Sequence, residues 1–248
     1  TMAKGFYANS NQYFIRYIAQ RFGYFNTLQS IAGASEASGF PINYLMTMKK
    51  GKQLCGKILT PIMAAGLIMN LFINKNTPLW VIIIAIFLYN FGFSGPGFTA
   101  TNIQPDVTDV DEMITGRRRE GVISTFNTLI KKTINGLMSA FTGFILNGFG
   151  LRTGAENANA LEQTAKGIFG LRLTYCILPL IFVALVYVCV FTYKMTREDH
   201  KMIIEAIKEK KETGRCTLTP EQIKRCEEIA GQSFGDMWIG RPSADTLF

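Results

Sequence analysis

Apolar residues form long, nearly continuous blocks along this chain, and short charged segments separate the blocks. A helix of a water-soluble protein usually carries one apolar stripe, whereas residues 78–88 and 177–190 are apolar on every side. A helix needs about 20 mostly apolar residues to cross a membrane. The pattern predicts four such helices, at residues 55–73, 78–103, 121–149 and 168–193.

A fifth segment, residues 25–48, is less apolar but also long enough to span a membrane. Its polar residues include Asn26, Gln29, Glu36 and Asn43. The small residues at 31–35 would let neighbouring helix backbones approach closely. We predict a helix that its neighbours shield from lipid, and the alternative is a re-entrant or surface helix.

Lysine and arginine gather in alternate connections between these segments. Because such residues are enriched on the cytoplasmic side of membranes, residues 49–54, 104–120 and 197–248 are predicted to be cytoplasmic. In this orientation the first spanning helix enters from outside. Residues 1–24 have the pattern of a loop and a frayed helix end, so we expect further helices to precede this chain in the natural protein.

The formal net charge of +8 fits a membrane orientation signal better than a nucleic-acid interface. The basic residues lie at the ends of apolar blocks and not along one face with interleaved aromatic residues. Five cysteines without a C-x-x-C pair, and a single histidine, give no metal-ligand or redox spacing. Because no catalytic set and no phosphate-binding glycine loop is visible, we expect neither enzyme activity nor a cofactor.

The charged tail, residues 197–248, carries two local helix-start patterns. Thr196–Asp199 and Thr219–Gln222 both have the spacing of a capping box. The glycines expected to end these two helices are Gly214 and Gly231. Acidic and basic residues nearly balance here, so the sequence predicts a solvated, partly ordered tail in which His200 faces solvent.

Two adjacent lysines, Lys131 and Lys132, lie near the middle of the predicted helix at 121–149. A charge at that depth costs about 2.5–3.5 kcal/mol unless it is paired or solvated. At least one of the two is therefore expected to face a polar cavity, because snorkelling works poorly at a helix centre. Glu36 is expected either to pair with one of these lysines or to lie near a polar interface.

Polar residues at helical spacing accompany the lysines on the same predicted helix. They are Ser124, Asn127, Thr128, Lys131 and Asn135, and Lys132 follows Thr128 by one turn. Hydroxyl, amide and ammonium groups suit a polyhydroxylated solute, since each sugar hydroxyl both donates and accepts hydrogen bonds. Hydrogen bonding between helices is an equal alternative for any single serine or threonine.

The run Gly95-Pro96-Gly97 lies within the predicted helix at 78–103. Proline removes one backbone hydrogen bond and glycine loosens the turn. We predict either a broken helix that lines a transport site or a purely structural kink.

The residues from Asp106 to Gly121 read DVTDVDEMITGRRREG, and Asn127, Thr128 and Lys132 follow them. Together these motifs resemble the signature loop and next helix of the glycoside–pentoside–hexuronide:cation symporters, the melibiose-permease family within the major facilitator superfamily. The likeness covers about residues 20–212. It implies an all-α membrane protein whose five helices correspond to helices 8–12 of a twelve-helix transporter. Residues 1–196 would then be the C-terminal transmembrane half, before a short cytoplasmic helical tail.

The resemblance also implies roles for single residues. Lys132 matches the lysine of the shared sugar and cation region, Thr128 matches a polar sugar-side position, and Asn127 belongs to the same stretch. The residues that match the cytoplasmic loop, whose charges help hold the transporter halves together, are Asp106, Asp109, Glu112, Arg117 and Glu120. Gly97 departs from melibiose permease, which has an aromatic residue there, and this leaves the sugar platform and the substrate open.

The function implied by the resemblance is symport of a sugar or glycoside with Na+ or H+ by alternating access. The implied partners are the co-transported cation, the lipid bilayer of the cell inner (plasma) membrane and the N-terminal half of the same transporter. That half carries the family's cation-binding acids. A same-fold transporter of a lipid or organic anion and a non-transporting membrane sensor remain as alternatives.

Overall fold

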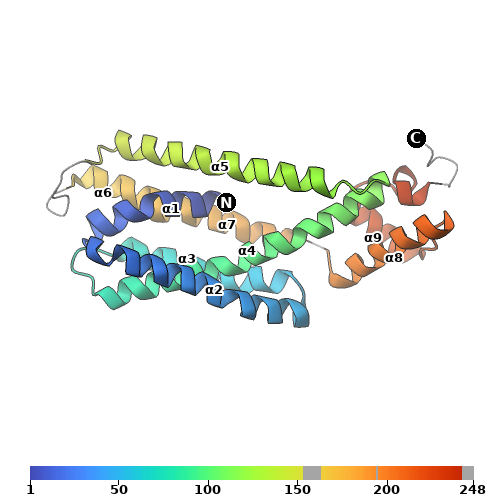
Figure 1. Cartoon of the computed structure of the whole chain (residues 1–248), viewed down its shortest axis with the longest axis horizontal. Helices are drawn as coiled ribbons and strands as arrows, with labels where there is room; N and C mark the ends of the chain where they lie inside the picture. Colours follow the sequence, from blue (N-terminus) through green and yellow to red (C-terminus); the bar gives the residue numbers. More distant parts are fainter. Residues whose placement is uncertain (153–162, 194, 242–248) are drawn as a thin grey trace.

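The computed structural model describes residues 1–152, 163–193 and 195–241, and these residues form helices without any β-strand. Long helices run side by side along one axis, and a group of short helices lies at one end of them (Figure 1). The predicted fold class, an all-α bundle followed by a helical tail, is confirmed. The last residues of the predicted tail, 242–248, lie outside the described part of the chain.

Each of the five predicted membrane segments forms a helix. The bounds are α2 (Phe25–Lys50), α3 (Gln53–Phe72), α4 (Leu79–Thr115), α5 (Glu120–Gly148) and the continuous run of α6 (Ala165–Arg172), the π-helical η4 (Leu173–Ile177) and α7 (Leu178–Thr192). Among the described helices, α3, α4 and the α6–α7 run are long and apolar enough to cross a membrane. That α2 and α5 also cross it stays a prediction, because polar residues such as Glu36 and Lys132 interrupt them.

Residues 1–24 pack as helix, and the prediction of a loop was wrong. They form α1 (Met2–Tyr13), the π-helical η1 (Phe14–Ile18) and the short 3-10 helix η2 (Phe22–Tyr24). Aromatic side chains anchor this segment in the core. Tyr7 stacks on Tyr89 and Tyr175 with ring centroids 3.7 and 4.5 Å apart, and Phe14 stacks on Tyr175 at 4.0 Å. These contacts join α1 to both α4 and η4.

Of the two alternatives predicted at Gly95-Pro96-Gly97, the broken helix is wrong, because α4 continues through this run as an α-helix with Pro96 inside it. The structural kink stays a prediction. Glycine serves close packing here. A Cβ atom added at Gly92 would lie 2.3 Å from the backbone nitrogen of Met63, and one at Gly95 would lie 2.5 Å from Cβ of Leu59. These glycines let α3 pack closely against α4, and the surrounding bundle compensates for the backbone hydrogen bond that Pro96 cannot donate.

The region 104–120, predicted as a loop, is helical as far as Thr115. Gly116 ends α4 in the left-handed conformation, with φ of +70°, and its N–H donates to the carbonyl oxygen of Glu112 at 2.8 Å. Only residues 116–119 connect α4 to α5. The loop prediction failed because the charged residues lie on one face of a helix that other elements cover.

The tail consists of α8 (Arg197–Thr213), α9 (Pro220–Ala230) and the short 3-10 helices η5 (Phe234–Asp236) and η6 (Trp238–Gly240). Both predicted capping boxes are confirmed, and Gly214 and Gly231 end the helices with φ of +73° and +71°. The prediction of a solvated tail was wrong, because the tail builds a hydrophobic core with the end of α4. Its buried members are Met113, Met195, Ile203, Ala206, Ile207, Cys226, Met237 and Ile239.

The described parts of the three regions predicted to be cytoplasmic, residues 49–54, 104–120 and 197–241, lie at the same end of the bundle (Figure 1). Lys52 pairs with Asp106, and the guanidinium of Arg197 donates to the carbonyl oxygen of Met48 at 3.1 Å. The predicted topology requires these regions to lie on one side of the membrane, and their position at one end of the bundle agrees with it. The side of the membrane to which this end belongs stays a prediction.

Candidate functional site

Three acids of α4 lie on one helical face near its C-terminal end. Asp106, Asp109 and Glu112 follow one another at intervals of three residues, a spacing that places them along one side of a helix. Their side chains are only 4%, 11% and 2% exposed. A buried carboxylate is costly unless it finds a counter-charge and hydrogen bonds, so the neighbours of this acid row determine its stability.

Asp106 joins α4 to α3 and to the end of α7. The Lys52 ammonium lies 2.5 Å from one carboxylate oxygen and also donates to the carbonyl oxygen of Asn102 at 2.9 Å. The hydroxyl of Tyr193 donates to the second oxygen at 2.9 Å. Burial, reinforced by the hydrogen bond to Asp106, raises the pKa of Tyr193, so the hydroxyl keeps its proton and remains a donor.

His200 lies between two members of the acid row. Its Nε2 atom is 2.8 Å from Asp109 and 3.4 Å from Asp106, and its side chain is 21% exposed. The prediction that His200 faces solvent was therefore wrong. The capping box at Thr196–Asp199 sets the start of α8 and so aims the next residue, His200, at α4.

Glu112 takes its counter-charges from two directions. Arg118, in the connection to α5, lies 3.2 Å from Glu112 and 3.4 Å from Asp109, and Lys211 of α8 bonds to Glu112 as well. Glu120 pairs with the same Arg118 at the exposed edge, at 3.4 Å. Arg117, which the resemblance indicated, is also engaged with its surroundings.

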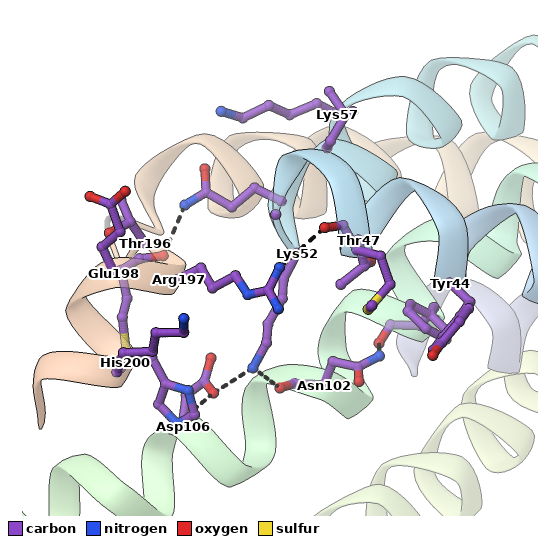
Figure 2. A pocket seen from close by; sticks show the side chains of 17 residues that line it. Tyr44, Thr47, Lys52, Lys57, Asn102, Asp106, Thr196, Arg197, Glu198 and His200 are labelled. Carbon is purple, nitrogen blue, oxygen red and sulfur yellow. Dashed lines mark hydrogen bonds and ion pairs between the residues drawn. The ribbon is translucent and has the colours of Figure 1, made fainter. Parts of the chain in front are cut away.

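A cavity of 810 Å³ opens beside Asp106, between the ends of α2, α3 and α4 and the start of α8 (Figure 2). In Figure 2, Lys52 reaches across to Asp106 and Asn102, and His200 approaches Asp106 from the other side. Water and ions therefore have access to one end of the acid row.

Asp106, Asp109 and Glu112, together with their cationic partners, can hold neighbouring helix ends against α4 and release them when the ion pairs break, and we call this group the lock. Its counter-charges come from α3, from the connection to α5 and from α8, so all of these must stay close to α4 for every charge to be paired. Removing one partner from a buried ion pair typically costs about 3–5 kcal/mol. Moving these helix ends apart would carry a similar cost unless water from the cavity solvates the separated charges.

The residues proposed for solute coupling lie on α5. Asn127 donates to the side-chain oxygen of Gln104 at 2.8 Å, which ties α5 to α4. Thr128 and Lys132 are exposed, and no element in the described ranges covers them. The buried residues of α5, Met138, Thr142 and Leu146, lie further along the helix, in its C-terminal half. Whether Lys132 faces a transport cavity stays a prediction.

Glu36 has a partner that the sequence analysis did not consider. The ammonium of Lys4, on α1, lies 2.8 Å from one carboxylate oxygen of Glu36 and 2.9 Å from the other. The proposed pairing with Lys131 or Lys132 is thus replaced by a pair between α1 and α2.

Several residues of these charge clusters were missed, namely Lys4, Lys52, Arg118, His200 and Lys211. Most of their contacts join residues far apart in the sequence, such as Lys52 with Asp106. The spacing of the acid row was a usable signal, since three buried acids on one face require cations nearby.

Comparison with known proteins identifies the family of this chain. A family model described as MFS/sugar transport protein matches residues 1–197. Neither the curated proteins nor the solved structures include a match to this chain. Since the family match covers the whole helical bundle, this chain belongs to the MFS/sugar transport protein family.

Proposed function

We propose that this protein couples the transport of a sugar or glycoside to that of Na+ or H+ by alternating access. The family match over residues 1–197 carries this proposal. The all-helical bundle with three membrane-span candidates agrees with it. In such transporters the gradient of the coupling ion biases a rocking motion that opens a central site to each side in turn.

The acid row of α4 would be the lock on the cytoplasmic side. While one end of the transporter is closed, Lys52, Arg118 and Lys211 neutralise the buried carboxylates. Opening that end separates some of these pairs and lets water in. Each pair joins two elements, so a motion that separates those elements would break the pair, and the pairs would then stabilise the closed conformation alone.

Coupling would take place on α5, where Lys132 and Thr128 share one exposed face and Asn127 holds the helix to α4. A lysine can exchange partners or release its proton when a cation competes for the same carboxylates. Those carboxylates would belong to the N-terminal half of the transporter, which the exposed face of α5 would meet in the plasma membrane.

Uptake into proteoliposomes tests the proposal. The full-length protein is reconstituted and given an inward Na+ or H+ gradient together with one radiolabelled sugar at a time. We expect accumulation above the outside concentration for at least one sugar, and its loss when an ionophore dissipates the gradient. Gradient-driven uptake of a lipid or an organic anion, without any sugar, would refute the substrate class.

A further inference from the structure

A charged pair and an aromatic ring meet in the middle of the bundle. The ammonium of Lys4 binds both carboxylate oxygens of Glu36, at 2.8 and 2.9 Å, and lies 4.3 Å from the ring centroid of Phe93. These side chains come from α1, α2 and α4, so three separate helices place them at one point. This Lys4–Glu36–Phe93 cluster is not explained by the lock at the end of α4.

Glu36 and Phe93 lie far from the ends of their helices, whereas Lys4 lies in the first turn of α1. At 1.5 Å of rise per residue, Glu36 is about 16 Å from the first residue of α2 and about 21 Å from the last. Phe93 is likewise about 21 Å from the start of α4. Ionisable residues at such depth in a membrane protein are costly and usually serve transport, so the pair needs a reason beyond stability.

The cluster is open on one side. The side chains of Lys4 and Glu36 are 43% and 27% exposed, and Phe93 is half-buried against the core. Behind it lies the aromatic core around Tyr7 and Tyr89. A polar cluster that the core supports and that remains open at mid-bundle depth is accessible to a solute in a central transport pathway.

The chemistry of the cluster fits a polyhydroxylated ring. A carboxylate accepts hydrogen bonds from hydroxyl groups, an ammonium donates to them, and an aromatic face packs against the apolar C–H face of a sugar. In this structure Lys4 and Glu36 form an ion pair, and the Lys4 ammonium lies over the face of the Phe93 ring. Sugar hydroxyls would take over part of these hydrogen bonds without leaving a charge unpaired.

We propose that Lys4, Glu36 and Phe93 form a sugar-binding subsite of the transporter. This inference rests on the proposed function and gives that function a location in this part of the protein. The subsite consists of residues of α1, α2 and α4, whereas Thr128 and Lys132 lie on α5.

The test uses the full-length protein and binding as well as transport. The probes are the p-nitrophenyl α- and β-glycosides of galactose and glucose, whose binding is measured by isothermal titration calorimetry in detergent. For the probe that binds the unaltered protein, Glu36→Gln should weaken the affinity roughly 10- to 100-fold, since it removes a charged hydrogen-bond acceptor. Phe93→Leu should weaken it roughly 3- to 10-fold through loss of the stacking face.

Two controls separate binding from folding. Phe87→Leu changes an exposed aromatic residue of the same helix and should leave the affinity unchanged. The double variant Lys4→Met/Glu36→Gln removes both charges, so a purely structural ion pair predicts recovery of affinity, whereas a subsite predicts continued loss. Thermal unfolding of each variant in the same detergent shows that the protein is folded.

The outcomes also distinguish the two proposals. If no sugar probe binds to or is transported by the unaltered protein, the proposed function fails. If a probe is bound and transported but Glu36→Gln and Phe93→Leu keep its affinity, or the double variant recovers it, the subsite is refuted while the function stands.

Discussion

Two charge clusters in the described part of this chain are built differently. At the end of α4, three carboxylates share cations from three elements, and a cavity adjoins them. In the middle of the bundle, Glu36 has one ion-pair partner within the described ranges, Lys4. Shared counter-charges make a cluster tolerant of the loss of one member, because the remaining charges can rearrange. In an isolated pair no further charge can replace a lost partner, so each residue depends on the other for neutralisation.

The largest expected effect tests this difference directly. Lys4→Met leaves Glu36 without its ion-pair partner and should cost about 2–3 kcal/mol of folding free energy, less than for a fully buried pair because the two side chains are 43% and 27% exposed. Lys52→Met should cost about 1 kcal/mol, because Asp106 keeps the hydroxyl of Tyr193 and the imidazole of His200. Thermal unfolding of both full-length variants in detergent measures the ranking. An equal or larger loss for Lys52→Met would show that the two clusters do not differ in this way.

A similar comparison concerns packing, because the interface between α3 and α4 has little space for a larger side chain at some glycines and ample space at others. Gly95→Ala should destabilise the protein by about 1–3 kcal/mol, because the new Cβ would lie 2.5 Å from Cβ of Leu59 and 2.7 Å from the carbonyl oxygen of Cys55. Gly97→Ala is the matched control, since its Cβ would meet the ring of Phe93 at 3.5 Å, an ordinary contact. It should be neutral or slightly stabilising, as alanine favours helix. Thermal unfolding that ranks the two variants the other way would contradict the close approach of α3 and α4.

These cases show which features the sequence could predict. The capping boxes at Thr196 and Thr219 and the helix ends at Gly214 and Gly231 depend on residues a few positions apart, and all were predicted correctly. The helical segments followed from long apolar blocks. Local patterns of this kind hold whatever the tertiary structure.

The features that were mispredicted depend on distant contacts. His200 and Asp109 are 91 residues apart, and Lys4 and Glu36 are 32 apart. Charged residues beyond position 103 looked like a loop because the cations that cover them were not apparent from the local sequence. The broken-helix alternative at Gly95-Pro96 was wrong for the same reason, since the close approach of α3 that requires glycine there is a tertiary contact.

A smaller effect is expected where the tail meets the lock. Glu112→Gln leaves Arg118 and Lys211 close together without the charge that both contact, so α8 should detach more often. Loss of a charged hydrogen bond of about 1.5–3 kcal/mol corresponds to roughly a 10- to 100-fold faster modification of the fully buried thiol of Cys226. Maleimide labelling in a background with Cys189→Ser and Cys216→Ser measures the rate. Glu205→Gln, an exposed position on α8, is the control, and equal rates for both variants would show that Glu112 does not hold the tail.

The smallest expected effect concerns acid sensitivity within the tail. Hydrogen bonds from Arg225, at 3.0 and 2.8 Å, lower the pKa of Asp199 from 3.8 to about 2, and the capping-box contacts with Thr196 add to the shift. A carboxyl group whose pKa is lower in the folded state stabilises that state above its unfolded pKa. The contribution of Asp199 is therefore fully present above pH 4 and fades as the pH falls from about 4 towards 2. The fluorescence of Trp238, which packs against the tail core, reports the docking of the tail in a Trp80→Phe background.

Asp199 is one of many carboxyl groups in the protein, so comparison with a variant isolates its contribution to stability. Asp199→Asn removes the titrating group but keeps its size and leaves an amide to cap α8. The unaltered tail should be more stable than the variant at pH 6, and the difference should shrink on acidification through the stated window. This pair is only partly buried and exchanges with water, so the effect should be well below that of Glu112→Gln. A difference that stays constant from pH 6 to pH 2 would mean that Asp199 acts through hydrogen-bond geometry and not through its charge.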